Sequence, residues 1–228
     1  MKNLVSYISI ILCLIGALLW QIFADSKSYY IPAVVILILS MIPFLLSFEK
    51  SKPSARELTL MAGLIAIAVV SRAVFYLIPQ FKPIGAVIVA SGACLGAKRG
   101  YLIGAFSAFI SNFIFGQGIW TPFQMVALGL VGLFSGVIFS KIEPKRFTMS
   151  VIGFLLTFAL YGVIVDLSSV LMMTTEISLK SVITIYLAGV PFNLVFGACT
   201  FVFLLLFGEA FIKKINRIII KYGILKKS

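Results

Sequence analysis

Residues 58–79 read LTLMAGLIAIAVVSRAVFYLIP, an apolar run whose only charged side chain is that of Arg72. A helix rises about 1.5 Å per residue, so a run of this length can cross the hydrocarbon core of a bilayer, which is about 30 Å thick. Backbone groups in lipid must find hydrogen-bond partners within their own segment, and a helix provides them. The stretch therefore predicts a membrane-spanning helix.

The rest of the chain repeats this pattern. The 228 residues are 61% hydrophobic and 11% charged, with a mean hydropathy of +1.16, whereas soluble domains are about 45–50% apolar and about 25% charged. Breaks at charged, proline and glycine clusters predict helices over 4–24, 29–47, 58–79, 84–97, 101–115, 123–140, 148–172 and 182–207. We therefore predict an all-α integral membrane protein of about eight helices. The fourth and fifth are short, so they cross with little tilt, thin the bilayer, or lie partly inside the bundle.

The net charge of +12 does not indicate a nucleic-acid partner, because the basic residues lie between apolar runs and form no soluble basic face. They follow the positive-inside rule instead. With the N-terminus inside, three basic residues fall outside: Lys27, Lys82 and Lys180. Fifteen fall on the cytoplasmic side: Lys2, Lys50, Lys52, Arg56, Lys98, Arg99, Lys141, Lys145, Arg146, Lys213, Lys214, Arg217, Lys221, Lys226 and Lys227. This distribution predicts a multi-pass protein with both termini in the cytoplasm.

Polar segments divide the chain into four parts. We predict an N-terminal transmembrane hairpin over 1–48, a cytoplasmic linker over 49–57, a six-helix core over 58–211 and a basic cytoplasmic tail over 212–228. Lys2 and the apolar run behind it are typical of a retained signal anchor or of a cleaved signal peptide, and the length of the run favours retention. The tail has helical spacing and a basic face, which suit the inner leaflet or a partner protein.

Two ionisable side chains fall inside predicted spans. Arg72 and Asp166 lie at similar depths, each about 10 Å from the outer end of its helix at 1.5 Å per residue. Such groups usually face the bundle interior or a watery cavity. A structural ion pair between them and direct contact with a ligand are both open. The amides of Asn112, Gln124 and Asn193 share the same half of the membrane, so the five groups together predict a cavity that opens to the outside.

The loop between the fifth and sixth predicted helices carries further polar groups. It contains two glycines suited to tight turns, and Trp120 lies beside Gln117 and Thr121. Trp120 is either an interfacial belt residue or part of a lid over a ligand. The loop that contains Phe81 and Lys82 is expected on the same side of the membrane.

Small residues four apart, Ala62 and Ala66, lie near the cytoplasmic end of the span that contains Arg72. Such spacing lets another helix approach closely. An internal packing seam and a contact with another subunit are equally compatible with it.

Several activities are disfavoured by residues that the chain lacks. Histidine is absent, and Cys13, Cys94 and Cys199 lie within apolar runs, so neither a metal protease nor a disulfide framework is indicated. No Walker-type phosphate loop is present, so energy coupling must come from a partner. We expect no enzyme activity and no cofactor. A stand-alone secondary transporter is disfavoured because no internal repeat is visible, and a purely structural protein would leave Arg72 without a purpose.

Four segments resemble a known family, the substrate-binding S components of energy-coupling factor (ECF) vitamin transporters. They are 71–73 (SRA), 79–83 (PQFKP), 104–112 (GAFSAFISN) and 116–124 (GQGIWTPFQ), and the likeness extends over about 55–225. The resemblance implies a six-helix bundle that binds a vitamin near the outer surface beneath external loops. It also implies a transmembrane coupling subunit and two cytoplasmic ATPase subunits as partners. Members topple in the bilayer to release the vitamin.

The resemblance assigns roles to several of these residues. It places Ala62 and Ala66 on the helix that docks on the coupling subunit, and Gln117, Trp120 and Asn193 where family ligands bind. The expected function is high-affinity vitamin capture for an ECF-type ABC transporter in a bacterial plasma membrane. The segments look most like members associated with cobalamin or related corrinoids, and riboflavin, thiamine, pantothenate or a queuosine-type base remain open. The N-terminal hairpin departs from the six-helix pattern.

Overall fold

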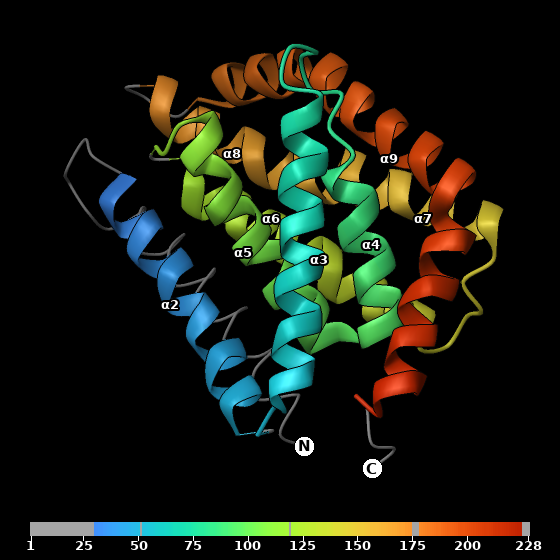
Figure 1. Ribbon diagram of the computed structural model, residues 1–228. Helices are drawn as coiled ribbons and strands as arrows, with labels where there is room; N and C mark the ends of the chain where they lie inside the picture. The colour runs from blue at the N-terminus through green and yellow to red at the C-terminus, as the bar shows by residue number, and fades with distance from the viewer. Residues whose placement is uncertain (1–29, 51, 119, 175–177, 225–228) are drawn as a thin grey trace.

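The computed structural model describes residues 30–50, 52–118, 120–174 and 178–224, and every regular element within them is a helix (Figure 1). In chain order these are α2 (Tyr30–Glu49), α3 (Ala55–Val74), α4 (Ile84–Leu95), α5 (Ala97–Phe115), α6 (Thr121–Phe139), α7 (Arg146–Leu155), the π-helical segment η1 (Leu156–Tyr161), α8 (Gly162–Met173) and α9 (Leu179–Tyr222). The predicted first span, 4–24, lies outside the described residues. The all-helical class predicted from the sequence is confirmed for the described part of the chain.

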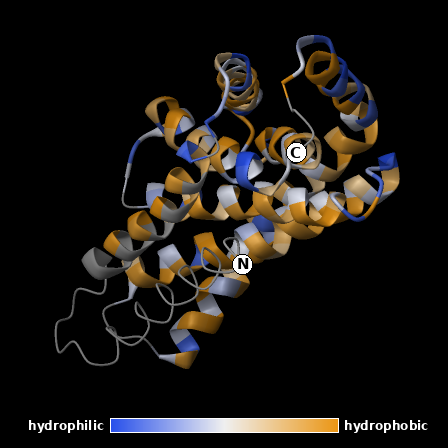
Figure 2. Cartoon of the chain, turned by 90° about the horizontal axis from the view of Figure 1, so that it is seen from below, coloured by the Kyte–Doolittle hydropathy of each residue, from blue (hydrophilic) through white to orange (hydrophobic). Residues whose placement is uncertain are grey.

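Four of the described helical segments are long and apolar enough to cross a membrane: α3, α6, the run from α7 to α8, and α9. Their outward faces carry large exposed apolar side chains, such as Val74 on α3 and Leu187 on α9. Figure 2 shows apolar residues along the flanks of the helices and hydrophilic residues mainly at their ends and in loops. The protein is a multi-pass membrane protein.

The short helix α4 lies inside the bundle. Its 12 residues rise about 18 Å, too little to cross the bilayer alone. Ile88 and Val89 are fully buried, and most of its other side chains are buried as well. Of the three arrangements open to the short spans, α4 therefore takes the one in which a helix packs against protein more than against lipid.

Helices α5 and α6 pack backbone to backbone. A methyl group on Gly100 would collide with the carbonyl of Gly132, and one on Gly104 would collide with the carbonyl of Leu128. Glycine at these points lets the two helices approach more closely than side chains would allow. This contact holds the C-terminal end of α5 beside the N-terminal end of α6, where several of the predicted site residues lie.

One π-helical segment interrupts the helical run from Arg146 to Met173. η1 spans Leu156–Tyr161, between α7 and α8. Segments of this kind are rare and occur frequently at functional sites. Here the segment ends at Tyr161, whose side chain borders the cavity described below.

Helix α9 is a single helix of 44 residues that contains Pro191. Figure 1 shows it crossing the top of the molecule and then bending down one side. The break that we expected after 207 is absent, so the tail expected to begin at 212 starts within α9. The physical reason is continued packing: Ile212 and Ile215, beyond the expected break, are buried, and the helix continues to Tyr222, where Gly223 caps it.

Helix α2 packs on α5 and α6, with the ring of Phe44 stacked on that of Tyr101 at 3.8 Å between centroids. It is the only described helix of the predicted N-terminal hairpin, because the other predicted helix, 4–24, falls outside the described residues. The hairpin itself therefore stays a prediction, as do the four predicted segment boundaries.

Candidate functional site

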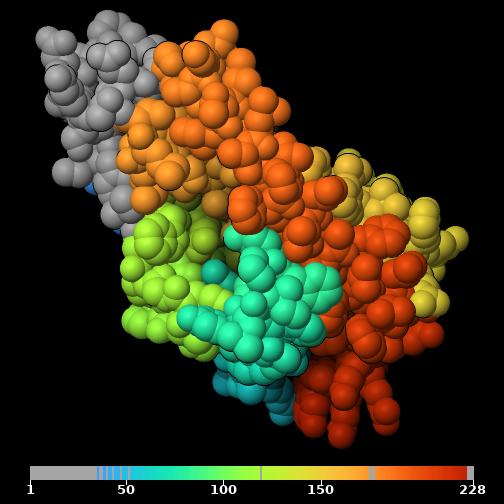
Figure 3. Space-filling view, turned by 90° about the horizontal axis from the view of Figure 1, so that it is seen from above, coloured from blue at the N-terminus to red at the C-terminus, as the bar shows by residue number. Residues whose placement is uncertain are grey.

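A cavity of about 820 Å³ lies where the C-terminal end of α3 meets α5, α6, α8 and the first half of α9. The loop between α3 and α4 borders it, so we call this part of the molecule the loop end. Figure 3 looks onto the loop end and shows a hollow between the α3–α4 loop in teal, the α5–α6 region in light green and α9 in orange. Five of the predicted site residues line the cavity: Arg72, Lys82, Gln124, Asp166 and Asn193.

Arg72 is fixed by α5. Its Nη1 donates to Ser111 Oγ at 2.5 Å and to Asn112 Oδ1 at 2.9 Å. The guanidinium lies 4.2 Å from the centroid of the Phe115 ring. Two charge-assisted hydrogen bonds and an aromatic face compensate the charge without a carboxylate.

Asn112 stands behind Arg72 and connects it to α6. It is 1% exposed, and its Nδ2 donates to Thr121 Oγ1 at 3.0 Å and to Gln124 Oε1 at 2.9 Å. Thr121 in turn donates to Gln117 Oε1 at 3.0 Å. The structure thus brings Arg72 and four of the residues predicted with it into one network, in which only Arg72 and Gln124 reach the cavity wall.

Lys82 holds the α3–α4 loop against the end of α3. Its Nζ donates to the carbonyls of Phe75 at 2.6 Å and Tyr76 at 3.0 Å, and it lies 5.0 Å from the centroid of the Phe115 ring. Burial lowers the pKa of Lys82 from its usual range, and the positive charge of Arg72 lowers this pKa further. Because both groups lie near the Phe115 ring, the ammonium and the guanidinium occupy the same end of the cavity.

Asp166 and Asn193 form a second polar group, on the side of the cavity away from Arg72 and Lys82. Asn193 Nδ2 donates to Asp166 Oδ2 at 2.7 Å, which joins α8 to α9. Asp166 and Arg72 do not pair: among the described residues, the ion pairs are Arg99 with Glu57 and Lys145 with Glu143. The ion pair that the sequence left open between Arg72 and Asp166 is not formed, because each charge is held by neutral partners on its own side of the cavity.

Phe81 and Trp120 do not line the cavity. The Phe81 ring packs edge-on against Phe75 at 5.4 Å and Phe203 at 6.1 Å between centroids, on the side of α9. Trp120 precedes α6, is 37% exposed, and its ring lies against Gly118. A binding role for either residue stays a prediction that the cavity lining does not support.

Aromatic residues of the cavity wall were missed by the sequence analysis, which followed charges and amides. They are Tyr76, Phe115, Tyr161, Phe192 and Phe196. Tyr76 and Phe115 lie within four residues of Arg72 and Asn112, so the sequence near the C-terminal ends of α3 and α5 could have indicated them. Nothing in the spacing around Tyr161 indicates a π-helical segment.

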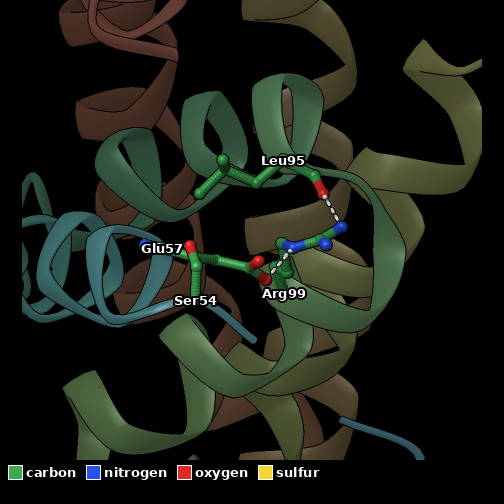
Figure 4. A network of polar contacts seen from close by, with 4 residues as sticks. All are labelled: Ser54, Glu57, Leu95 and Arg99. Carbon is green, nitrogen blue, oxygen red and sulfur yellow. Dashed lines mark hydrogen bonds and ion pairs between the residues drawn. The ribbon is translucent and has the colours of Figure 1, made fainter. Parts of the chain in front are cut away.

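The second predicted site, formed by Ala62 and Ala66, lies toward the N-terminal end of α3, away from the cavity. Ala62 and Ala66 are both exposed, and Gly63 has no atom within 4 Å of the position that a Cβ would take. The opposite face of α3 is anchored by Glu57, which is 5% exposed and bonds Arg99 Nε at 2.5 Å (Figure 4). The small residues therefore form an open strip on α3, whose opposite face is held by the ion pair between Glu57 and Arg99.

The chain resembles a known protein family. A family model described as "ECF-type riboflavin transporter, S component" matches residues 52–213. Helices α3 to α8 and most of α9 fall within this range, whereas α2 precedes it. No curated protein and no solved structure matches the chain.

Proposed function

The chain belongs to the family described as the S component of ECF-type riboflavin transporters, and from this membership we propose that it captures riboflavin as the substrate-binding subunit of a vitamin importer. ATP hydrolysis would take place in separate subunits. The proposal places the protein in a bacterial plasma membrane, where it needs no cofactor of its own.

The cavity at the loop end carries this proposal. Its volume of about 820 Å³ is within the range of about 300–1,000 Å³ that is usual for small-molecule sites. Aromatic rings from the α3–α4 loop, α5, η1 and α9 offer faces for a flat ligand, and Arg72, Gln124, Asp166 and Asn193 offer donors and acceptors. This combination of flat apolar faces and a few convergent polar groups suits a flavin ring with a hydroxylated chain.

Cobalamin, which the sequence resemblance favoured, is not supported by the family match, whose description names riboflavin. A corrinoid is several times larger than a flavin and would need most of the cavity or more. We therefore replace the corrinoid by riboflavin in the proposal.

We further propose that the exposed strip of Ala62, Gly63 and Ala66 on α3 docks on a transmembrane coupling subunit, which associates with two cytoplasmic ATPase subunits. Small side chains let a partner helix come close. The N-terminal end of α3 meets the C-terminal end of α9, where Arg56 Nη1 donates to the Tyr222 carbonyl at 3.1 Å. Basic residues gather there, so the positive-inside rule supports a cytoplasmic location for this end and an outward cavity.

The direct test is to purify the protein from cells grown in rich medium, denature it, and identify any released molecule by mass spectrometry. We expect riboflavin, and we expect added riboflavin to lose fluorescence on binding because aromatic rings stack on it. Release of cobalamin, or a failure to bind riboflavin after the protein is stripped, would contradict the proposal. Uptake by the chain alone in liposomes would support the stand-alone secondary transporter instead.

A further inference from the structure

The cavity is electrostatically divided. Arg72 and Lys82 occupy the end beside Phe115, and Asp166 lies on α8 across the cavity. Arg72 Nη1 bonds Ser111 and Asn112, and Lys82 Nζ bonds two backbone carbonyls, so these bonds use two of the five guanidinium donors and two of the three ammonium donors. The cationic end therefore presents positive potential and the remaining N–H donors beside the Phe115 ring.

The other end presents acceptors. Asn193 Nδ2 donates to Asp166 Oδ2 at 2.7 Å, and within the described residues no group donates to Asp166 Oδ1 or to Asn193 Oδ1. A carboxylate oxygen and an amide oxygen therefore lie side by side on the cavity wall with unused lone pairs. Such a pair suits hydroxyl groups, which can donate to both.

This acceptor pair is built by two close helix contacts. A Cβ on Gly189 would lie 2.5 to 2.7 Å from the atoms of the Asp166 carboxylate, and a Cβ on Gly162 would lie 2.7 Å from Asn193 Nδ2. Glycine at both positions lets each polar side chain lie directly on the backbone of the facing helix. The orientation of the pair therefore depends on the α8–α9 contact.

We propose that Asp166 is the specificity residue of the cavity, which selects a ligand with a hydroxylated chain and rejects the phosphorylated form of that ligand. This inference rests on the proposed function. The flavin ring lies at the end of Phe115, Arg72 and Lys82, and the ribityl chain points to Asp166 and Asn193. A phosphate on the ribityl chain would meet a carboxylate, and like charges repel strongly where water is excluded.

The test compares three flavins by fluorescence titration: riboflavin, flavin mononucleotide, which carries a phosphate on the ribityl chain, and lumiflavin, which lacks the chain. Wild-type protein should bind riboflavin at least about tenfold more tightly than the mononucleotide. Asp166→Asn should weaken riboflavin binding by about tenfold and reduce the ratio of riboflavin affinity to mononucleotide affinity. It should change lumiflavin affinity by less than about twofold. Glu143→Gln removes an exposed carboxylate far along the chain from the cavity residues and should change none of the three.

Each outcome bears on a different statement. If wild-type protein binds no flavin, the proposed function fails. If riboflavin binds but Asp166→Asn weakens lumiflavin as much as riboflavin, or leaves the preference over the mononucleotide unchanged, the specificity role of Asp166 is wrong. Lys82→Gln tests the orientation of the bound flavin, and it should weaken the binding of riboflavin and of lumiflavin alike. If it weakens riboflavin binding alone, the ribityl chain lies at the cationic end and the proposal is wrong. Melting temperatures in detergent identify any variant that has lost its fold.

Discussion

Arg72 and Asp166 border the same cavity with opposite charges and do not pair. Arg72 donates to Ser111 and Asn112, and Asp166 accepts from Asn193. An ion pair would neutralise both groups and close the space between them. Because neutral partners hold each charge in place, both remain available to a ligand at the cost of a partly uncompensated burial.

The contact between Gly189 and Asp166 predicts a sharp steric effect. Gly189→Ala would place a methyl group 2.5 to 2.7 Å from the carboxylate atoms, so α8 and α9 must separate or Asp166 must turn. We expect riboflavin affinity to fall about tenfold or more, which corresponds to about 1.4 kcal/mol, with the helical content unchanged. Titration and circular dichroism measure the two effects.

Gly63→Ala is the matched control for Gly189→Ala, because no atom lies within 4 Å of the new methyl group. Its riboflavin affinity should equal that of the wild-type protein. Equal affinities for the Gly189 and Gly63 variants would show that the α8–α9 contact does not shape the site.

Substitutions of Phe115 and Trp120 distinguish ligand binding by the cavity wall from ligand binding by the predicted lid. Phe115 lines the cavity beneath Arg72, whereas Trp120 lies outside the lining. Phe115→Ala should therefore weaken riboflavin binding by about tenfold or more, and Trp120→Ala should weaken it less. If Trp120→Ala causes the larger loss in the same titration, the loop between α5 and α6 acts as a lid, as the sequence suggested.

The open strip on α3 predicts a defect in transport without a defect in binding. Ala62→Leu combined with Ala66→Leu adds bulk to an exposed surface far along α3 from Arg72, so riboflavin binding should be unchanged. Uptake of radiolabelled riboflavin by cells that also contain the coupling and ATPase subunits should fall to background. The docking proposal is wrong if uptake continues at the wild-type rate.

Val202→Leu provides the control for that experiment. Val202 is 40% exposed on α9, and the change adds bulk to an apolar surface away from the strip. Uptake should be retained, which would show that added bulk at another exposed apolar position does not block transport.

The ion pair between Glu57 and Arg99 predicts a stability effect at the end of α3 away from the cavity (Figure 4). Arg99→Ala would leave the Glu57 carboxylate buried and without its cation, so the free energy of unfolding should fall by about 1–3 kcal/mol. Denaturation in detergent measures the change. Lys145→Ala, which breaks the exposed pair with Glu143, should cost about 0–1 kcal/mol, and an equal cost for both variants would show that the Glu57 pair contributes little.

The sequence by itself determined the membrane class and the position of the polar groups along their helices. A charged or amide side chain in an apolar span must face protein or water, so Arg72, Gln124, Asp166 and Asn193 could be predicted to share a chamber. The small residues Ala62 and Ala66 could be recognised from spacing alone.

Only the tertiary structure decided which groups pair and which face the cavity. Pairing depends on helix rotation and on contacts such as Gly189 with Asp166, which connect residues that are distant along the chain. Loop residues have no periodicity that would indicate their direction, so Phe81 and Trp120 could not be separated from Lys82 by sequence. The continuity of α9 was likewise decided by burial of Ile212 and Ile215, because packing against other helices, rather than local composition, determines where a helix ends.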